Sequence, residues 1–162
     1  IEDLSKKTER KIKVFIVGDG ELRSEIENRV TQLIQQDIDI LMTSWIIDIA
    51  SFNAGMDIMC LTSKNEGTPV SLIEAQASNL PVISTDVGGV SDIVAENETG
   101  FIIPRKNKRN FIEKLKILVE EDEIRNKMKS KGWEHVHLKF SYKRLATDME
   151  SYYKKLLSQQ DK

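Results

Sequence analysis

Two glutamates near the middle of the chain have the residue type and spacing that best suit chemistry. Glu66 lies in the polar run of residues 63–69, and Glu74 follows eight positions later. Pro69 suits the first position of a helix because it has no N–H to leave unpaired, and it favours an extended, N-capping Thr68. Helical side chains lean toward the helix N-terminus, so we expect the Glu74 carboxylate to point back toward the loop that carries Glu66.

The carboxylates and the helix start together indicate a class of ligand. Two carboxylates repel a phosphate, whereas the free N–H groups of a helix N-terminus attract one. A nucleotide sugar suits both, because its diphosphate can face the amides while its hydroxyls donate to the carboxylates. The spacing alone also allows a simpler interpretation, in which Glu74 complements the helix dipole and Glu66 is a solvated loop acid.

The surrounding sequence predicts an α/β architecture that would position this loop. Apolar runs predict strands near 13–17, 38–42, 57–62, 81–85 and 100–103, and the segments between them predict helices near 21–34, 47–54, 69–79 and 89–95. This alternation without hairpin turns favours a parallel sheet with right-handed crossovers. After Pro104 the pattern predicts three amphipathic helices, beginning near Phe111, Ile124 and Tyr142.

We interpret the 162 residues as one domain, which is long enough to bury its own core. Residues 1–11 are a connector or the end of a helix, residues 12–104 form the α/β core, and residues 105–162 form C-terminal helices. Ligands of open parallel sheets bind beyond the carboxyl ends of the strands. The loop that carries Glu66 is predicted to lie at that edge.

Two glycine-containing turns follow other predicted strands. Gly18 and Gly20 resemble part of a dinucleotide fingerprint, but Arg23 stands where the third glycine should be. This turn either permits close approach of a ligand or is a plain turn. Likewise, Gly88 and Gly89 either expose amides to a ligand or simply permit a positive φ.

Composition and charge restrict the partners. With 40% apolar and 31% charged residues, the chain is typical of folded globular proteins. Residues 1–103 carry a net charge of −9 and residues 104–162 one of +7. The basic residues of the tail alternate with acids at helical spacing and lack interleaved aromatic residues, which argues against nucleic acid. Solvated helix faces and contact with a membrane surface both remain open.

Cysteine use and hydropathy indicate a cytoplasmic protein. Cys60 is the only cysteine, and its apolar neighbours predict a buried, inert thiol in a reducing compartment. No apolar stretch approaches the ~20 residues that span a bilayer. His135 and His137 do not share a helix face and have no Cys or His cluster beside them, so we expect no metal site. The protein is expected in the cytoplasm, free or peripheral at the inner face of the membrane.

Several segments, in order along the chain, resemble the group 1 (GT4-type) glycosyltransferases. They are the Glu66-x7-Glu74 pattern, Leu-Pro-Val-Ile at 80–83, the Gly-Gly pair at 88–89, Thr-Gly-Phe at 99–101 and Val-Gly-Asp-Gly-Glu-Leu-Arg at 17–23. The resemblance covers residues 11–104 well and the tail less specifically. It implies a GT-B fold of two Rossmann-like domains, of which this chain would be the C-terminal, donor-binding half: a three-layer α/β domain with a parallel sheet.

The resemblance also implies roles for individual residues. Glu66 would contact the transferred sugar, and Glu74 would hold the ribose hydroxyls. Residues 67–71 would supply amides to the sugar and phosphate, although Pro69 removes one backbone donor where the family commonly has Phe-Gly at 68–69. The implied donor-binding residues are Gly18, Gly20, Lys64, Gly67, Thr68, Val70, Ser71 and Glu74. No metal or organic cofactor is implied, because the UDP- or GDP-sugar donor is a substrate.

The sequence departs from the family at its start. The family's first strand, with the Arg and Lys that neutralise the donor diphosphate, has no counterpart, and Lys64 is the nearest cation. Since that strand is central in the family's sheet, we expect exposed strand edges that a partner, a rearrangement or self-association compensates.

The sequence therefore predicts the donor-binding domain of a retaining enzyme that moves a hexose or N-acetylhexosamine. The acceptor, a glycan or a lipid-linked glycan, would be bound by a missing N-terminal domain, so this piece is expected to be inactive alone. The alternative is a non-catalytic nucleotide-binding or interaction module that retains the fold.

Overall fold

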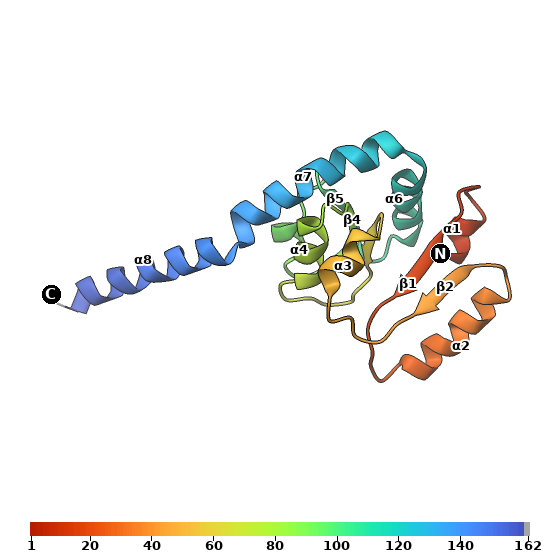
Figure 1. Ribbon diagram of the computed structural model, residues 1–162, viewed down its shortest axis with the longest axis horizontal. Helices are drawn as coiled ribbons and strands as arrows, with labels where there is room; N and C mark the ends of the chain where they lie inside the picture. Colours follow the sequence, from red (N-terminus) through yellow and green to blue (C-terminus); the bar gives the residue numbers. More distant parts are fainter. Residues whose placement is uncertain (161–162) are drawn as a thin grey trace.

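The computed structural model describes residues 1–160, which alternate between strands and helices up to residue 104 and are helical beyond it (Figure 1). The elements are, in chain order, α1 (Glu2–Ser5), β1 (Lys13–Ile16), α2 (Arg23–Ile34), β2 (Asp39–Met42), α3 (Ile49–Ala54), β3 (Met59–Leu61), α4 (Val70–Ala77), β4 (Val82–Asp86), α5 (Val90–Ile93), β5 (Gly100–Pro104), α6 (Lys108–Glu120), α7 (Asp122–Phe140) and α8 (Tyr142–Gln160). The predicted order of strands and helices is confirmed.

The strands are all parallel, as predicted, but they form two sheets instead of one. β1 pairs with β2, and β4 lies between β3 and β5. Within the described residues β1 and β3 share no ladder, so the sheet is divided between them. Cys60 lies on β3 at this break and its side chain is exposed, so the predicted burial is wrong. The reason is that β3 pairs on one side only, whereas the apolar run at 58–61 suggested a central strand. The protein atoms around Cys60 still raise the pKa of its thiol to about 12, which agrees with the predicted inert thiol.

Helices cover both faces of the β3-β4-β5 sheet. Alternating residues of β4 point to opposite faces, so Val82 packs with α4 and α5 while Ile83 packs with α6 and α7. The sheet thus lies between two helical layers, which gives the predicted three-layer arrangement. The β1-β2 sheet has a smaller core of its own, formed with α2 around Val30, Leu33 and Ile40.

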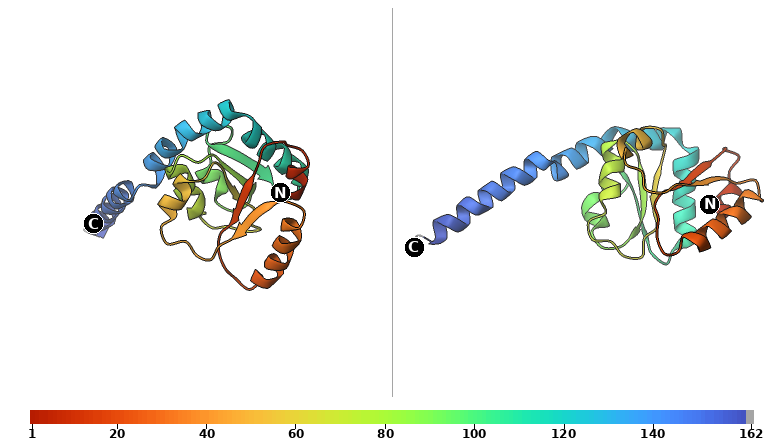
Figure 2. Two further views of the ribbon diagram at one scale, coloured as in Figure 1. Left: turned by 45° about the vertical axis from the view of Figure 1, so that its right-hand side comes forward. Right: turned by 60° about the horizontal axis from the view of Figure 1, so that its bottom comes forward.

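A helical arm formed by α7 and α8 follows the core. α7 packs closely on α4, where a Cβ on Gly132 would lie 2.8 Å from the carbonyl oxygen of Gln76. α8 extends away from the body of the molecule, as both views of Figure 2 show. No helix among the described residues is long and apolar enough to cross a membrane.

The apolar residues of α8 lie on one side of the helix. At 100° per residue they fall within an arc of about 140°. Their side chains are exposed at Tyr142, Leu145, Met149, Tyr152, Tyr153, Leu156 and Leu157. α8 therefore presents an amphipathic surface whose apolar side faces solvent.

Candidate functional site

The loop of residues 62–69 lies at the carboxyl edge of the β3-β4-β5 sheet. It leaves β3 after Leu61 and enters α4 at Val70, and parallel pairing brings the ends of β4 and β5 to the same edge. Glu66 on the loop and Glu74 on α4 are both half-buried. Of the other predicted donor-binding residues in this segment, Ser71 is half-buried, and the exposed ones are Lys64, Gly67, Thr68 and Val70.

The start of α4 differs from the prediction by one residue. The helix begins at Val70, and Pro69 occupies the capping position with φ −73° and ψ 90°. The prediction that the helix starts within a residue of Pro69 is confirmed, but the capping position expected at Thr68 falls on Pro69, because the extended ψ of Pro69 delays the first helical turn. The carbonyl of Pro69 accepts from the amide of Leu72 at 3.0 Å. Proline has no side-chain acceptor, so no side chain caps the N–H groups of this helix start.

The 62–69 loop is held by the end of β4 and the turn after it, residues 85–89, which we together call the β4 turn. The Thr85 hydroxyl donates to the carbonyl of Ser63 at 2.7 Å, and the Gly89 amide donates to the carbonyl of Gly67 at 2.9 Å. Gly88 has a φ of +50°. The positive φ that the sequence allowed for the glycine pair is therefore found at Gly88. The Gly89 amide is not exposed to a ligand, because it is hydrogen-bonded within the protein.

Arg105 is a residue of this edge that sequence reasoning missed. It follows β5, and its guanidinium donates to the carbonyl oxygen of Lys64 at 3.2 Å. Since β4 separates β3 from β5, the Arg105 side chain must cross the end of β4 to reach the loop. No local motif signals this contact, because the two residues are 41 positions apart.

The structure places Gly18 and Gly20 at the carboxyl end of β1, in the other sheet. Gly18 has a φ of +125°, and the Gly20 amide donates to Asp19 Oδ1 at 2.8 Å. Arg23 then donates to Asp19 Oδ2 at 2.9 Å, so the residue in the third-glycine position fixes the turn instead of leaving it open. Hydrogen bonding from Arg23 to Glu27 and the charge of Asp19 raise the pKa of Arg23.

Trp45 is a second residue that sequence reasoning missed. It lies on the loop after β2 and is 76% exposed. Its neighbour Ser44 accepts a hydrogen bond from Arg23 at 3.3 Å, which brings this loop beside the turn that contains Gly18. The sequence signal that could have identified it is a tryptophan directly after a predicted strand, where ligands of parallel sheets bind. The carboxyl edge of the β1-β2 sheet thus carries a flat aromatic surface.

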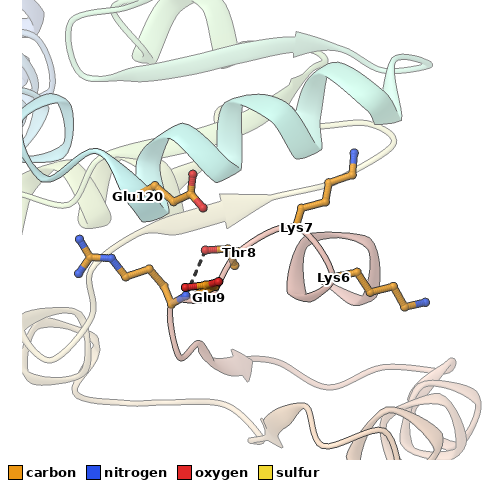
Figure 3. A pocket seen from close by; sticks show the side chains of 6 residues that line it. Lys6, Lys7, Thr8, Glu9 and Glu120 are labelled. Atoms are coloured by element: carbon orange, nitrogen blue, oxygen red, sulfur yellow. Dashed lines mark hydrogen bonds between the residues drawn. The ribbon is translucent and has the colours of Figure 1, made fainter.

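A hollow of about 670 Å³ opens elsewhere, lined by Lys6, Lys7, Thr8, Glu9, Arg10 and Glu120 (Figure 3). Residues 6–10 precede β1 and Glu120 ends α6, so the hollow lies toward the amino ends of the strands. Its lysine side chains spread outward in Figure 3 and do not converge on one point. It contains none of the predicted donor-binding residues.

Comparisons with known proteins agree with the architecture. The model of the family described as glycosyl transferases group 1 matches residues 1–135. The capsular polysaccharide biosynthesis glycosyltransferase CapM of Staphylococcus aureus is 28% identical over 150 residues, which cover 93% of this chain and 40% of CapM. The chain therefore spans less than half the length of that relative.

Solved structures show the same fold. A mutant of TarM from S. aureus, in complex with fondaparinux, α-GlcNAc-glycerol and UDP, superposes with a TM-score of 0.82 at 23% identity, covering 92% of this chain and 30% of TarM. The C-terminal domain of the group 1 protein LpcC from Francisella tularensis superposes with a TM-score of 0.67 at 20% identity, covering 85% of this chain and 90% of that domain. The fold is that of one domain of GT-B enzymes. Together with the family match, it shows that the chain belongs to the group 1 glycosyltransferases.

Proposed function

We propose that this chain is the nucleotide-sugar-binding part of a retaining glycosyltransferase. The observation that carries the proposal is a helix start without a side-chain cap at the carboxyl edge of one sheet, with half-buried Glu66 on the loop before it and half-buried Glu74 within the helix. Such an edge is where ligands of open parallel sheets bind. Family membership supports sugar transfer, and the UDP bound to the TarM mutant supports a uridine nucleotide as one candidate donor.

The proposed roles follow from charge. The diphosphate faces the amides of Gly67, Thr68, Val70 and Ser71 at the start of α4, whose dipole favours negative charge. Glu66 accepts hydrogen bonds from the transferred sugar, and Glu74 accepts them from the ribose. Lys64 adds a cation from the exposed side of the loop, and Gly18 and Gly20 lie near the nucleotide.

Leaving-group stabilisation is the catalytic contribution of these groups. As the bond from the anomeric carbon to the diphosphate breaks, negative charge grows on the departing phosphate oxygens. N–H groups that already point to this position stabilise the charge without reorganising. Glu66 is the catalytic residue in the sense that it contacts and orients the sugar, not as a nucleophile. This site needs neither a metal ion nor an organic cofactor from the protein.

The whole reaction extends beyond this chain. We propose transfer of a hexose or N-acetylhexosamine from a UDP- or GDP-sugar to a glycan or lipid-linked acceptor, in the cytoplasm or at the inner face of the membrane. The acceptor would be bound by another part of a longer protein, since the chain spans 40% of CapM. Without that part, we expect donor binding with little transfer.

Calorimetric titration tests the proposed donor site. UDP-glucose, UDP-N-acetylglucosamine and GDP-mannose are titrated into the chain and into its Glu74→Ala variant, with Glu134→Ala on α7 as a matched loss of one carboxylate. We expect one donor to bind, and Glu74→Ala to weaken it about tenfold or more, since a hydrogen bond to a charged group contributes about 1.5–3 kcal/mol. Absence of binding at millimolar donor, or equal affinity in Glu74→Ala, contradicts the proposal.

A second candidate function is interaction through the helical arm, and the exposed apolar side of α8 favours it. The partner we propose is a second copy of the chain, because Asp148 and Lys155 lie seven residues apart on one flank of that apolar side. In an antiparallel pair of α8 helices, each Asp148 would face the Lys155 of the other copy. Such association survives the double change of Glu66 and Glu74 to Ala, whereas donor binding does not.

A further inference from the structure

We propose that the β4 turn orients the donor-binding loop, and that Thr85, Gly88 and Gly89 are positioning residues for the donor. The inference rests on the proposed function, which places the donor on residues 64–71. It concerns residues that are not assigned a donor contact themselves. They act by fixing which groups of the 62–69 loop face the ligand.

The main chain of the loop lies directly on the two glycines. A Cβ on Gly88 would stand 1.7 Å from the carbonyl oxygen of Glu66 and 2.7 Å from its carbonyl carbon. A Cβ on Gly89 would stand 2.6 Å from the carbonyl oxygen of Gly67. Contacts this short exclude any side chain at either position, and the φ of +50° at Gly88 disfavours one independently. The glycines are therefore the surface on which Glu66 and Gly67 rest.

Hydrogen bonds fix three carbonyl groups of the loop on the side facing the protein. Ser63 accepts from Thr85 at 2.7 Å, Lys64 accepts from Arg105 at 3.2 Å, and Gly67 accepts from Gly89 at 2.9 Å. The donors come from the end of β4, the end of β5 and the glycine pair. The loop is thus tied to its neighbours on both sides of Glu66.

These carbonyl contacts determine the direction of the neighbouring amides. The peptide bonds of the structure are all trans, and in a trans peptide the C=O and N–H point in opposite directions. The N–H groups of Lys64, Asn65 and Thr68 therefore point away from the donors that bind the three carbonyls, which are Thr85, Arg105 and Gly89. Among the described residues, no acceptor receives a hydrogen bond from these three amides. The positive ends of the loop's peptide dipoles are left to face an anion such as a diphosphate.

Two other crowded glycines separate positioning from simple packing. A Cβ on Gly132 would lie 2.8 Å from the carbonyl oxygen of Gln76, and one on Gly100 would lie 2.1 Å from that of Val82. Both contacts are among core elements and involve no residue of the 62–69 loop. An alanine there should lower the stability of the fold but leave the orientation of the loop unchanged. Gly100→Ala is the matched control for Gly88→Ala, because its closest contact of 2.1 Å is nearer to the 1.7 Å at Gly88, and Gly132→Ala is a milder control.

Backbone NMR of the chain without ligand gives the first half of the test. In Gly88→Ala we expect amide exchange at Gly89 to become about tenfold faster or more, since the hydrogen bond to Gly67 is lost locally. The amide signals of residues 64–68 should shift as well. Thr85→Val keeps the shape of the side chain and removes the hydroxyl. It should shift the same signals, and it provides the test if Gly88→Ala does not fold. If the amide signals of residues 64–68 do not shift in Thr85→Val, the proposal is overturned.

Donor affinity gives the second half. Gly88→Ala and Thr85→Val should weaken the donor that the unchanged chain binds, whereas Gly100→Ala and Gly132→Ala should lower the melting temperature and keep the affinity. Equal affinity in variants whose loop signals have shifted overturns the positioning role. If the unchanged chain binds no donor, the proposed function fails, while the exchange result still decides whether the β4 turn orients the loop.

Discussion

The amide of Gly89 donates a 2.9 Å hydrogen bond to the carbonyl oxygen of Gly67. This bond joins the turn after one strand to the loop after its neighbour, so the residue that follows Glu66 is fixed by a strand other than its own. Parallel pairing makes this arrangement natural, because the loops after adjacent strands begin at the same edge. The conformation of the 62–69 loop is therefore determined by its contacts with the neighbouring strand ends and not by its own short sequence alone.

Gln76 offers a test of packing behind that loop. Its side chain is fully buried on α4, with Nε2 donating to the carbonyls of Leu72 at 3.0 Å and Ile93 at 3.4 Å. Within the described residues its Oε1 has no hydrogen-bond partner. His135 also bonds the Ile93 carbonyl, at 2.9 Å, so that group keeps a partner if the amide is removed.

We therefore expect Gln76→Met to leave the free energy of unfolding unchanged or raise it by about 1 kcal/mol, because it removes an unpaired buried acceptor. Gln76→Glu should lower that free energy by about 3 kcal/mol or more, since it buries an unpaired charge. Urea denaturation monitored by circular dichroism measures both. A clear loss of stability in Gln76→Met would show that Oε1 has a partner, such as a bound water.

The junction of α6 and α7 should make stability depend on pH. A hydrogen bond from Arg125, assisted by the charge of Arg10, lowers the pKa of Asp122 in the folded chain. A lowered folded pKa means that the Asp122 carboxylate stabilises the fold above its unfolded pKa. This contribution is lost as the pH falls through the folded value.

Asp122→Asn should accordingly lower the free energy of unfolding at pH 7 slightly, because the ion pair is half-exposed. The difference from the unchanged chain should disappear in acid, below the folded pKa of Asp122. Thermal denaturation from pH 7 down to pH 2 measures this, with Glu134→Gln as a control for removing one charge from α7. A difference that grows in acid would contradict the assignment.

The apolar side of α8 should cause the chain to self-associate. Contiguous apolar surface of this kind is rarely left in water by a monomer. Sedimentation velocity over a range of concentrations should show a reversible dimer, and the double variant Leu145→Glu, Leu156→Glu should be monomeric. Ser151→Glu with Ser158→Glu, on the opposite side of α8, should still dimerise. A monomer at every concentration in the unchanged chain would contradict the prediction.

Trp45 should report on nucleotide binding. Its exposed indole belongs to the loop whose Ser44 accepts a hydrogen bond from Arg23, whereas Trp133 stacks on His137 of α7 at a centroid distance of 4.4 Å. A nucleobase that stacks on Trp45 should quench its fluorescence. Titration with UDP should quench the unchanged chain and Trp133→Phe but not Trp45→Phe. Quenching that persists in Trp45→Phe would place the nucleotide elsewhere.

The strands and helices could be predicted because their signals are local. The apolar runs around Val14 and Ile83 are short and bounded by turn residues, and Pro69 marks the start of α4 to within one residue. The positions of Glu66 before that helix start and of Glu74 within the helix could be predicted for the same reason, whereas their meeting at one ligand edge stays a prediction. The resemblance to a known family then gave the pair a chemical role.

The contacts that fix the loop could not be predicted, because they join residues distant in sequence. Arg105 reaches Lys64 across β4, and nothing near either residue indicates the other. Cys60 is exposed because one side of β3 has no neighbouring strand. The apolar residues around Cys60 would be the same with or without that neighbour, so the sequence could not predict the exposure. Gly88 and Gly89 were recognisable as a turn, but their contact with Glu66 and Gly67 required the fold.

A two-dimensional NMR titration of the chain with UDP tests the central claim most directly. The account predicts that the largest changes in amide signals fall on residues 64–74 at the carboxyl edge, with little change at residues 6–10 around the hollow of Figure 3. Changes confined to residues 6–10 and Glu120, or no change at millimolar UDP, would contradict the assignment of the donor site.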